Sequence, residues 1–287
     1  MKRKFPFIWI ILLVFILNAR AFAIESISIA ATKRSIDNFE QFTQGKVAAN
    51  IDHFDSKPCT RQVVDILLVL KALKIAGFPD VRVVFKEVPN SARERAAVKS
   101  GMVVLGENDH WDMNFDDSVF MTDPIVMNGE FEKGIYIDPK PSNYELLYVN
   151  SLESLRNYTA VMVATWYVDW KTLEQMGIKN LEDAATAEGI FRMLHADRAR
   201  FTLYEFSAEE DFSRTVAGIR LIPIPGIKVG LSGSRHLMIS KIHPKGETVY
   251  HAVQKGLKEL RKSGVIQRAL TECGFLERRV ADWKKIN

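Results

Sequence analysis

Cysteine is scarce in this chain of 287 residues, which contains only Cys59 and Cys273. Two cysteines so far apart lack the close spacing of structural metal sites, so no metal and no cofactor is expected. In an oxidising compartment, two cysteines more often form a bridge than remain thiols. We therefore predict a disulfide between Cys59 and Cys273.

Long hydrophobic runs are absent beyond the N-terminus. Residues 5–17 form one apolar run, shorter than the roughly 20 residues that a membrane-spanning helix needs. Basic residues precede it at positions 2–4, and Ala21-Phe22-Ala23 follows it as a site that signal peptidase recognises. We predict that residues 1–23 are a cleaved signal peptide and that the mature protein is periplasmic. An uncleaved membrane anchor is the alternative.

An excess of basic charge is missing from the predicted mature chain. The sequence has 39 Lys and Arg residues against 35 Asp and Glu, but four of the basic residues and no acid lie within residues 1–23. Nucleic-acid binding needs a clustered basic face, so no nucleic-acid partner is expected. The mature length exceeds what one hydrophobic core usually serves, which predicts two domains.

Motifs of common enzymes are also missing, including G-x-S-x-G, H-E-x-x-H and the P-loop. His110 with Glu107, Asp109 and Asp112 is the one local group that resembles an acid–base site. We expect this segment to be a loop, on which neighbouring side chains point in different directions, so catalytic or metal use is less favoured. The protein is expected not to be an enzyme.

Strand and helix patterns alternate along the rest of the chain, which predicts an α/β fold with a mostly parallel sheet. Polar segments at 32–57 and 106–117 and a glycine-rich loop at 226–233 are left without regular structure. Strands are predicted at 26–31, 81–88, 102–105, 134–137, 160–164, 201–206, 221–224 and 236–240, and helices at 60–76, 92–99, 186–195, 212–218, 248–260 and 264–273.

The segment 152–170 combines a short polar helix, a buried strand and a second helix. Thr165 and Trp166 lie where the strand meets that second helix, and in α/β proteins ligands gather at such strand ends. The Thr165 hydroxyl could bind a ligand there, beside the aromatic surfaces of Trp166 and Trp170. An ordinary helix cap with two core aromatics is the alternative.

Four segments resemble the type 2 periplasmic solute-binding proteins related to amino-acid-binding family 3. Residues 120–124 are similar to the family's Phe-Thr/Ser-x-Pro segment, and residues 152–163 are similar to the segment that enters its second lobe. Residues 191–204 are similar to its LxxGRxD unit, in which Arg198 stands at the position of the Arg, and residues 239–244 are similar to the segment that returns into its first lobe. The family's usual Thr-x-x-Arg pair, which clamps a ligand carboxylate, is replaced by Trp111 and Asn114. An ordinary amino acid is therefore a doubtful ligand.

The resemblance implies a two-lobe α/β fold with a hinge between the lobes, which close on a small molecule. We expect lobe one to comprise 24–143 and 241–287, with both cysteines in it, and lobe two 144–240. The implied function is ligand capture for an ABC-type transporter by a monomer. The alternatives are a sensing module that signals to a membrane partner and, less favoured, a secreted enzyme. The expected ligand-binding residues are Arg34, Trp111, Thr122, Thr165, Trp166 and Glu205.

Overall fold

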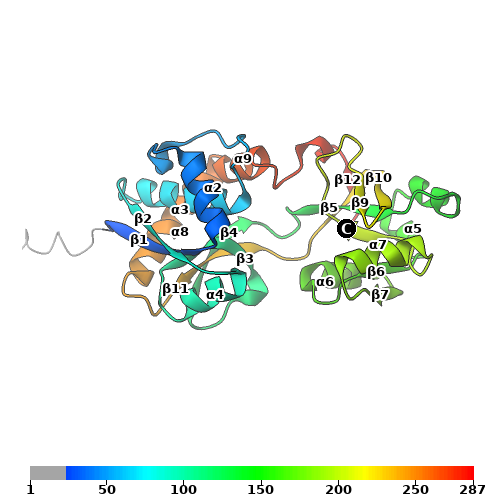
Figure 1. Ribbon diagram of the computed structural model, residues 1–287, viewed down its shortest axis with the longest axis horizontal. Coiled ribbons are helices and arrows are strands. Elements are labelled where there is room, and N and C mark those ends of the chain that lie inside the picture. The colour runs from blue at the N-terminus through cyan, green and yellow to red at the C-terminus, as the bar shows by residue number, and fades with distance from the viewer. Residues whose placement is uncertain (1–23) are drawn as a thin grey trace, which may run out of the picture. The chain divides into compact units, whose positions relative to one another are not determined.

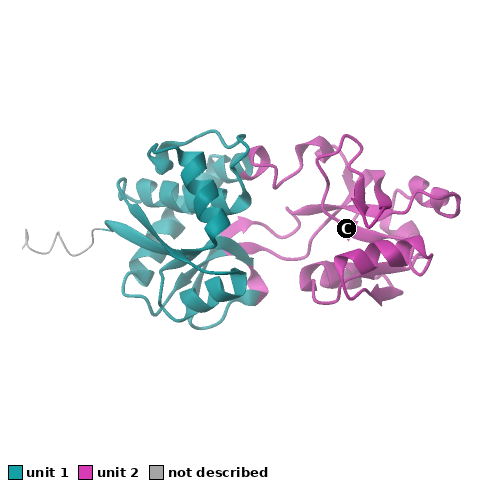
Figure 2. Ribbon diagram, viewed as in Figure 1, with its two compact units in different colours: residues 1–110, 114–123, 237–269 teal, residues 111–113, 124–236, 270–287 magenta. Residues whose placement is uncertain are grey.

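The computed structural model describes residues 24–287, so the predicted signal peptide lies outside the described residues. The described chain forms two compact units (Figure 2). Of the described residues, unit 1 contains those up to residue 110 together with 114–123 and 237–269, and unit 2 contains 111–113, 124–236 and 270–287. Within the described residues, no helix is both long and apolar enough to span a membrane.

A five-stranded sheet forms the centre of unit 1 (Figure 1). Its strand order is β2-β1-β3-β11-β4, and β1 runs parallel to both of its neighbours. The strands are β1 (Ser26–Ala31), β2 (Arg82–Glu87), β3 (Leu105–Trp111), β4 (Val119–Val126) and β11 (Arg235–Ser240).

Three helices of unit 1, α2, α3 and α4, begin where a side chain caps them. Thr32, Thr60 and Asn90 each accept a hydrogen bond from a backbone N–H in the first turn of the helix that follows. Helix α3 is buried along most of its length, and a Cβ atom on Gly256 of α8 would lie 2.3 Å from the Ala72 backbone, so these two helices pack very closely. The helices are α2 (Lys33–Thr43), η1 (Ala48–Asn50), α3 (Arg61–Ile75), α4 (Ser91–Lys99) and α8 (Gly246–Lys262).

Unit 2 is built on a second sheet of order β12-β10-β5-β8, with β9 paired to β10, and on the parallel pair β6-β7. The strands are β5 (Glu132–Ile137), β6 (Ala160–Met162), β7 (Leu181–Asp183), β8 (Thr202–Tyr204), β9 (Arg214–Val216), β10 (Ile219–Gly230) and β12 (Lys284–Lys285). The helices of the remaining chain are η2 (Asp112–Asn114), η3 (Pro141–Tyr148), α5 (Leu152–Leu155), α6 (Tyr167–Gln175), α7 (Ala187–His195), α9 (Val265–Glu272) and η4 (Arg278–Val280).

The compact units differ from the expected lobes at four places, since residues 111–113, 124–143 and 270–287 fall in unit 2 and residues 237–240 fall in unit 1. Residues 124–143 belong to unit 2 because β5 pairs with both β10 and β8. Residues 270–287 also belong there, since β12 pairs with β10 and the Trp283 ring packs edge-on against Phe206 and Phe212.

This division separates the two cysteines. Cys59 lies buried in unit 1 and Cys273 lies partly exposed in unit 2, whereas both are expected in lobe one. No disulfide joins Cys59 and Cys273 in the structure. The predicted bridge is not supported.

Three further segments differ from the sequence-based expectations. Residues 32–57 include helix α2, and the expected helix at 212–218 is instead strand β9 with its flanking turns. Strand β10 continues to Gly230, through part of the expected loop. The Pro and Gly residues that suggested a loop form an irregularity in β10, where the pairing with β5 shifts between Pro223 and Lys228.

Candidate functional site

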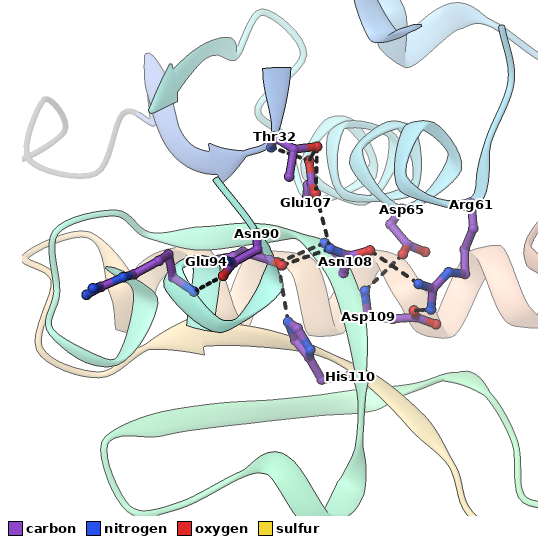
Figure 3. A network of polar contacts seen from close by, with 10 residues as sticks. Thr32, Arg61, Asp65, Asn90, Glu94, Glu107, Asn108, Asp109 and His110 are labelled. Carbon is purple, nitrogen blue, oxygen red and sulfur yellow. Dashed lines mark hydrogen bonds and ion pairs between the residues drawn. The ribbon is translucent and has the colours of Figure 1, made fainter. Parts of the chain in front are cut away.

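The carboxyl end of β3 carries four consecutive polar residues that are buried in unit 1, namely Glu107, Asn108, Asp109 and His110. The predicted loop at this position is therefore wrong, because β3 extends through it as a strand. Figure 3 shows that the side chains meet residues from α3, α4 and the start of α2. Each polar strand residue is paired within the unit.

Glu107 joins β3 to the end of β1. Its carboxylate accepts the backbone N–H of Thr32 at 2.8 Å and lies 3.3 Å from the Thr32 hydroxyl, while Thr32 also caps α2. Burial raises the pKa of Glu107, although its hydrogen bonds with Ser35 and Thr32 oppose that rise.

Glu94 joins α4 to the same strand and is fully buried. Its carboxylate accepts the Asn108 backbone N–H at 3.1 Å and the Asn108 side-chain amide at 2.8 Å, and it lies 3.3 Å from Nε2 of His110. Gly106 leaves the space for this carboxylate, because a Cβ atom there would lie 2.0 Å from Glu94 Oε1. The carboxylate beside His110 is therefore one that already joins α4 to β3.

Helix α3 reaches β3 through Arg61 and Asp65. The Arg61 guanidinium lies 2.5 Å from Asp109 Oδ1 and 3.2 Å from Asn108 Oδ1, and Asp65 Oδ2 accepts the Asp109 backbone N–H at 2.9 Å. Burial raises the pKa of the Asp109 carboxyl, and Arg61 opposes this rise. Among residues 24–287, no group of three or more His, Cys, Asp or Glu residues has a geometry that could hold a metal ion. The network links three helices to the strand.

In unit 2, the junction of β6 and α6 presents a different arrangement. Thr165 is exposed, Trp166 is half-buried, and α6 starts at Tyr167. Trp166 occupies the cap position, and no side chain in the described part of the chain caps this helix. Thr165 is therefore not the helix cap, and its hydroxyl lies at the start of a helix whose first N–H groups attract anionic or carbonyl oxygens.

A buried ion pair lies beside Trp166. Lys133 Nζ of β5 is 2.6 Å from Asp169 Oδ1 of α6, and the same ammonium group lies 5.9 Å from the centre of the Trp166 ring. Burial raises the pKa of Asp169, against the opposing effect of Lys133. Tyr204 packs edge-on against Trp166 with ring centres 6.1 Å apart. The indole is thus held in place from two sides.

The structure distributes the remaining predicted site residues over both units. In unit 1, Arg34 is exposed on α2, and Thr122 is 3% exposed with its hydroxyl accepting the Leu237 N–H at 3.1 Å and donating to the Asp123 carbonyl. Trp111 belongs to unit 2 rather than to the first lobe, and the Arg235 guanidinium lies 4.5 Å from its ring centre. Glu205 is exposed just beyond β8.

Thr165, Trp166 and Glu205 thus lie in one unit, with Tyr204, next to Glu205, in contact with Trp166. Sequence reasoning missed Lys133, Asp169 and Arg235. The sequence around a single charged residue does not show whether its side chain is buried. The one available signal was that Asp169 lies in the first turn of α6, close in sequence to Thr165.

No protein-family model matches the sequence, and no curated protein matches it. Solved structures do match. The probable amino-acid ABC transporter extracellular-binding protein ytmK of Bacillus subtilis has a TM-score of 0.52 and 16% identity, over 88% of this chain and 99% of that chain. The periplasmic VFT2 domain of BvgS from Bordetella pertussis has a TM-score of 0.52 and 10% identity, over 92% and 97%.

The L-cystine solute receptor of Neisseria gonorrhoeae, in its unliganded open conformation, has a TM-score of 0.50 and 13% identity, over 94% of this chain and 97% of that chain. Identities this low establish the fold and leave the ligand undetermined. The expectation drawn from the four resembling segments is confirmed at that level. This chain has the two-lobe α/β fold of the type 2 periplasmic solute-binding proteins.

Proposed function

We propose that this protein is a periplasmic solute-binding protein that captures a small molecule for an ABC-type transporter and is not an enzyme. The observation that carries the proposal is the start of α6, where exposed Thr165 and half-buried Trp166 lie at a helix end without a capping side chain. Helix N–H groups, a hydroxyl and an indole together suit a ligand with one polar and one flat apolar part. The fold supports the same role.

The ligand contacts that we propose in unit 2 are Thr165, Trp166, Glu205 and Trp111. Arg34 and Thr122 of unit 1 stay predictions, and the hydroxyl of Thr122 already joins β4 to β11. No Arg occurs between Met102 and Thr122, so the family's carboxylate clamp is missing from its usual place. A flat, partly apolar metabolite is therefore favoured over an ordinary amino acid.

A sensing role is the second candidate, with a membrane sensor in place of the permease as partner. The similar fold of the BvgS periplasmic domain motivates this candidate, and the fold is equally compatible with both roles. A gene for a permease or for a membrane kinase beside this one would separate the two roles.

The proposal is tested by a thermal-shift screen of residues 24–287 against amino acids and flat heterocyclic metabolites, followed by calorimetry on the hits. A binding protein gives saturable binding of one molecule per chain, with the ligand recovered unchanged. Chemical conversion of the hit would contradict the proposal, as would a screen without any saturable ligand.

A further inference from the structure

We propose that residues 278–287, here called the strap, bind and stiffen two stretches of unit 2 that lie next to crossings of the chain between the units, and that release of the strap loosens both stretches. The chain passes from unit 1 to unit 2 after residue 123 and returns after residue 236. Close to these crossings lie a turn at 127–130 and the last residues of β10. In proteins of this fold, the lobes move by bending of such connecting segments.

The two stretches lie directly against each other. The Gly129 N–H donates to the Leu231 carbonyl at 3.0 Å, and the Leu231 N–H donates to the Phe131 carbonyl at 2.9 Å. A Cβ atom on Gly230 would lie 2.7 Å from the Gly129 carbonyl oxygen, so only glycine fits at position 230. Gly129 has a φ of +75°, which glycine adopts without steric cost. The turn and the strand end therefore form one closely packed pair.

The strap binds both members of this pair. Lys285 Nζ donates to the Gly129 carbonyl at 2.7 Å. The side-chain amide of Asn287 donates to the Gly230 carbonyl at 2.8 Å and accepts the Gly230 N–H at 2.9 Å. The backbone of the intervening residue donates to β10, alongside which β12 runs parallel (Figure 1). Three successive residues of the strap thus hold the turn and the strand end together.

A shared carboxylate adds charge to these contacts. Glu132 of β5 lies 2.7 Å from Lys228 Nζ and 3.0 Å from Lys285 Nζ. The Lys228 ammonium also donates to the carbonyls of Val280 and Ala281 in the strap, at 2.8 and 3.2 Å. Lys228 is only 5% exposed, so water does not readily replace these two acceptors. The strap is therefore joined to both β5 and β10.

The strap is anchored at one end and accessible at the other. The Trp283 ring packs edge-on against Phe206 and Phe212, with ring centres 5.5 and 5.6 Å apart. Beyond it the side chains are exposed or half-buried, and β12 comprises two residues. Segments held by exposed hydrogen bonds open at a lower free energy than the buried core. Residues 284–287 therefore detach while Trp283 stays in place.

The double variant Lys285→Met/Asn287→Ala tests the proposal by native-state hydrogen exchange. The amides to follow are those of Gly129 and Leu231, because their acceptors lie in the two stretches and not in the strap. A tail that binds only to itself and its own acceptors would leave them unchanged. Loss of a hydrogen bond from a charged donor raises a local opening equilibrium by roughly tenfold or more. We expect both amides to exchange faster by that factor.

The matched control is Lys284→Met, which makes the same change one residue earlier, where Nζ donates to the Asn150 carbonyl at 3.1 Å. It should leave the amides of Gly129 and Leu231 unchanged. The Val161 N–H of β6, which donates to the Phe201 carbonyl at 3.0 Å, reports on unit 2 as a whole and should exchange at the wild-type rate in every variant.

Unchanged exchange at Gly129 and Leu231 in the folded double variant would overturn the proposal. The same acceleration in Lys284→Met, or an equal acceleration at Val161, would overturn it as well, because the effect would then not belong to the strap contacts. If the double variant does not fold, Lys285→Met alone must accelerate both amides. Wild-type rates in that single variant would count as the same refutation.

Discussion

The two units both bury charged side chains, but they balance the charges differently. In unit 2, Lys133 lies 2.6 Å from Asp169, and Glu132 lies 2.7 Å from Lys228 and 3.0 Å from Lys285, so each of these acids has its own cation. In unit 1, Arg61 lies against Asp109, and Glu107 and Glu94 accept hydrogen bonds from backbone N–H, amide and hydroxyl donors. The difference teaches that ion pairs hold the buried acids beside β5 and α6 in unit 2, whereas hydrogen-bond donors hold most of the acids around β3 in unit 1.

Lys133→Met is expected to have the largest effect on stability. It leaves the Asp169 carboxyl buried without its cation, which costs about 3–5 kcal/mol of unfolding free energy. The double variant Lys133→Met/Asp169→Leu removes both charges and should recover most of that loss. Denaturant unfolding of both variants measures this. A double variant less stable than the single one would refute the ion-pair interpretation.

Gly106→Ala tests the dense packing of the β3 network. The new Cβ atom would lie 2.0 Å from Glu94 Oε1, and Glu94 is held by Asn108 and His110, so the strand must shift at a cost of about 1–3 kcal/mol. The control is Gly189→Ala in α7, where the nearest atom is 3.4 Å away and the higher helix propensity of Ala should stabilise the helix by up to about 1 kcal/mol. Similar unfolding midpoints for the two variants would contradict the expectation.

Glu107→Gln is expected to change how the free energy of unfolding varies with pH, and to have less effect on its value at low pH. Burial raises the pKa of Glu107, so its contribution is present below the ordinary Glu value and is lost as the pH rises through the raised value. The amide oxygen of Gln can still accept the Thr32 N–H. Unfolding measured from acidic to alkaline pH should show a flatter profile for the variant; parallel profiles would count against this account.

Arg192→Ala should have the smallest effect. Arg192 and Glu188 form an exposed pair one turn apart on α7, and such pairs contribute about 0.3–0.5 kcal/mol. Because this pair is screened, the difference from wild type should vanish in high salt. A larger loss that persists in salt would mean that surface charge matters in unit 2 as much as buried charge.

Regular elements with a clear hydrophobic period were predictable. The strand expected at 26–31 is β1, and the helix expected at 60–76 is α3 within one residue at each end. The third strand was predicted at 102–105, but β3 runs from Leu105 to Trp111, because its polar residues are buried on both faces and lack the alternation that identifies a half-exposed strand. The partners of these polar side chains, among them Glu94, Arg61 and Thr32, lie in other elements of unit 1.

Of the candidate site residues, those at the junction of β6 and α6 had the most predictable position in the fold, and their role in binding stays a prediction. Thr165 and Trp166 lie where the sequence placed them, since a buried apolar run followed by a helix has few other arrangements. Trp111, expected in the first lobe, falls in unit 2, because the residue at which the chain leaves unit 1 depends on long-range pairing. The burial of Lys133 likewise depends on Asp169, 36 residues away.

The proposed binding role is tested most directly by calorimetric titration of a screening hit into wild type, Trp166→Ala and Trp170→Ala. Both tryptophans lie at or in α6, but the Trp170 indole donates to Glu174 on its own helix, so its loss controls for removal of an aromatic side chain. Removing a buried aromatic side chain that contacts a ligand typically costs about 2 kcal/mol or more of binding free energy. Trp166→Ala should therefore weaken binding by about thirtyfold, while Trp170→Ala should change it little. Unchanged affinity in a folded Trp166→Ala variant would contradict the proposed site.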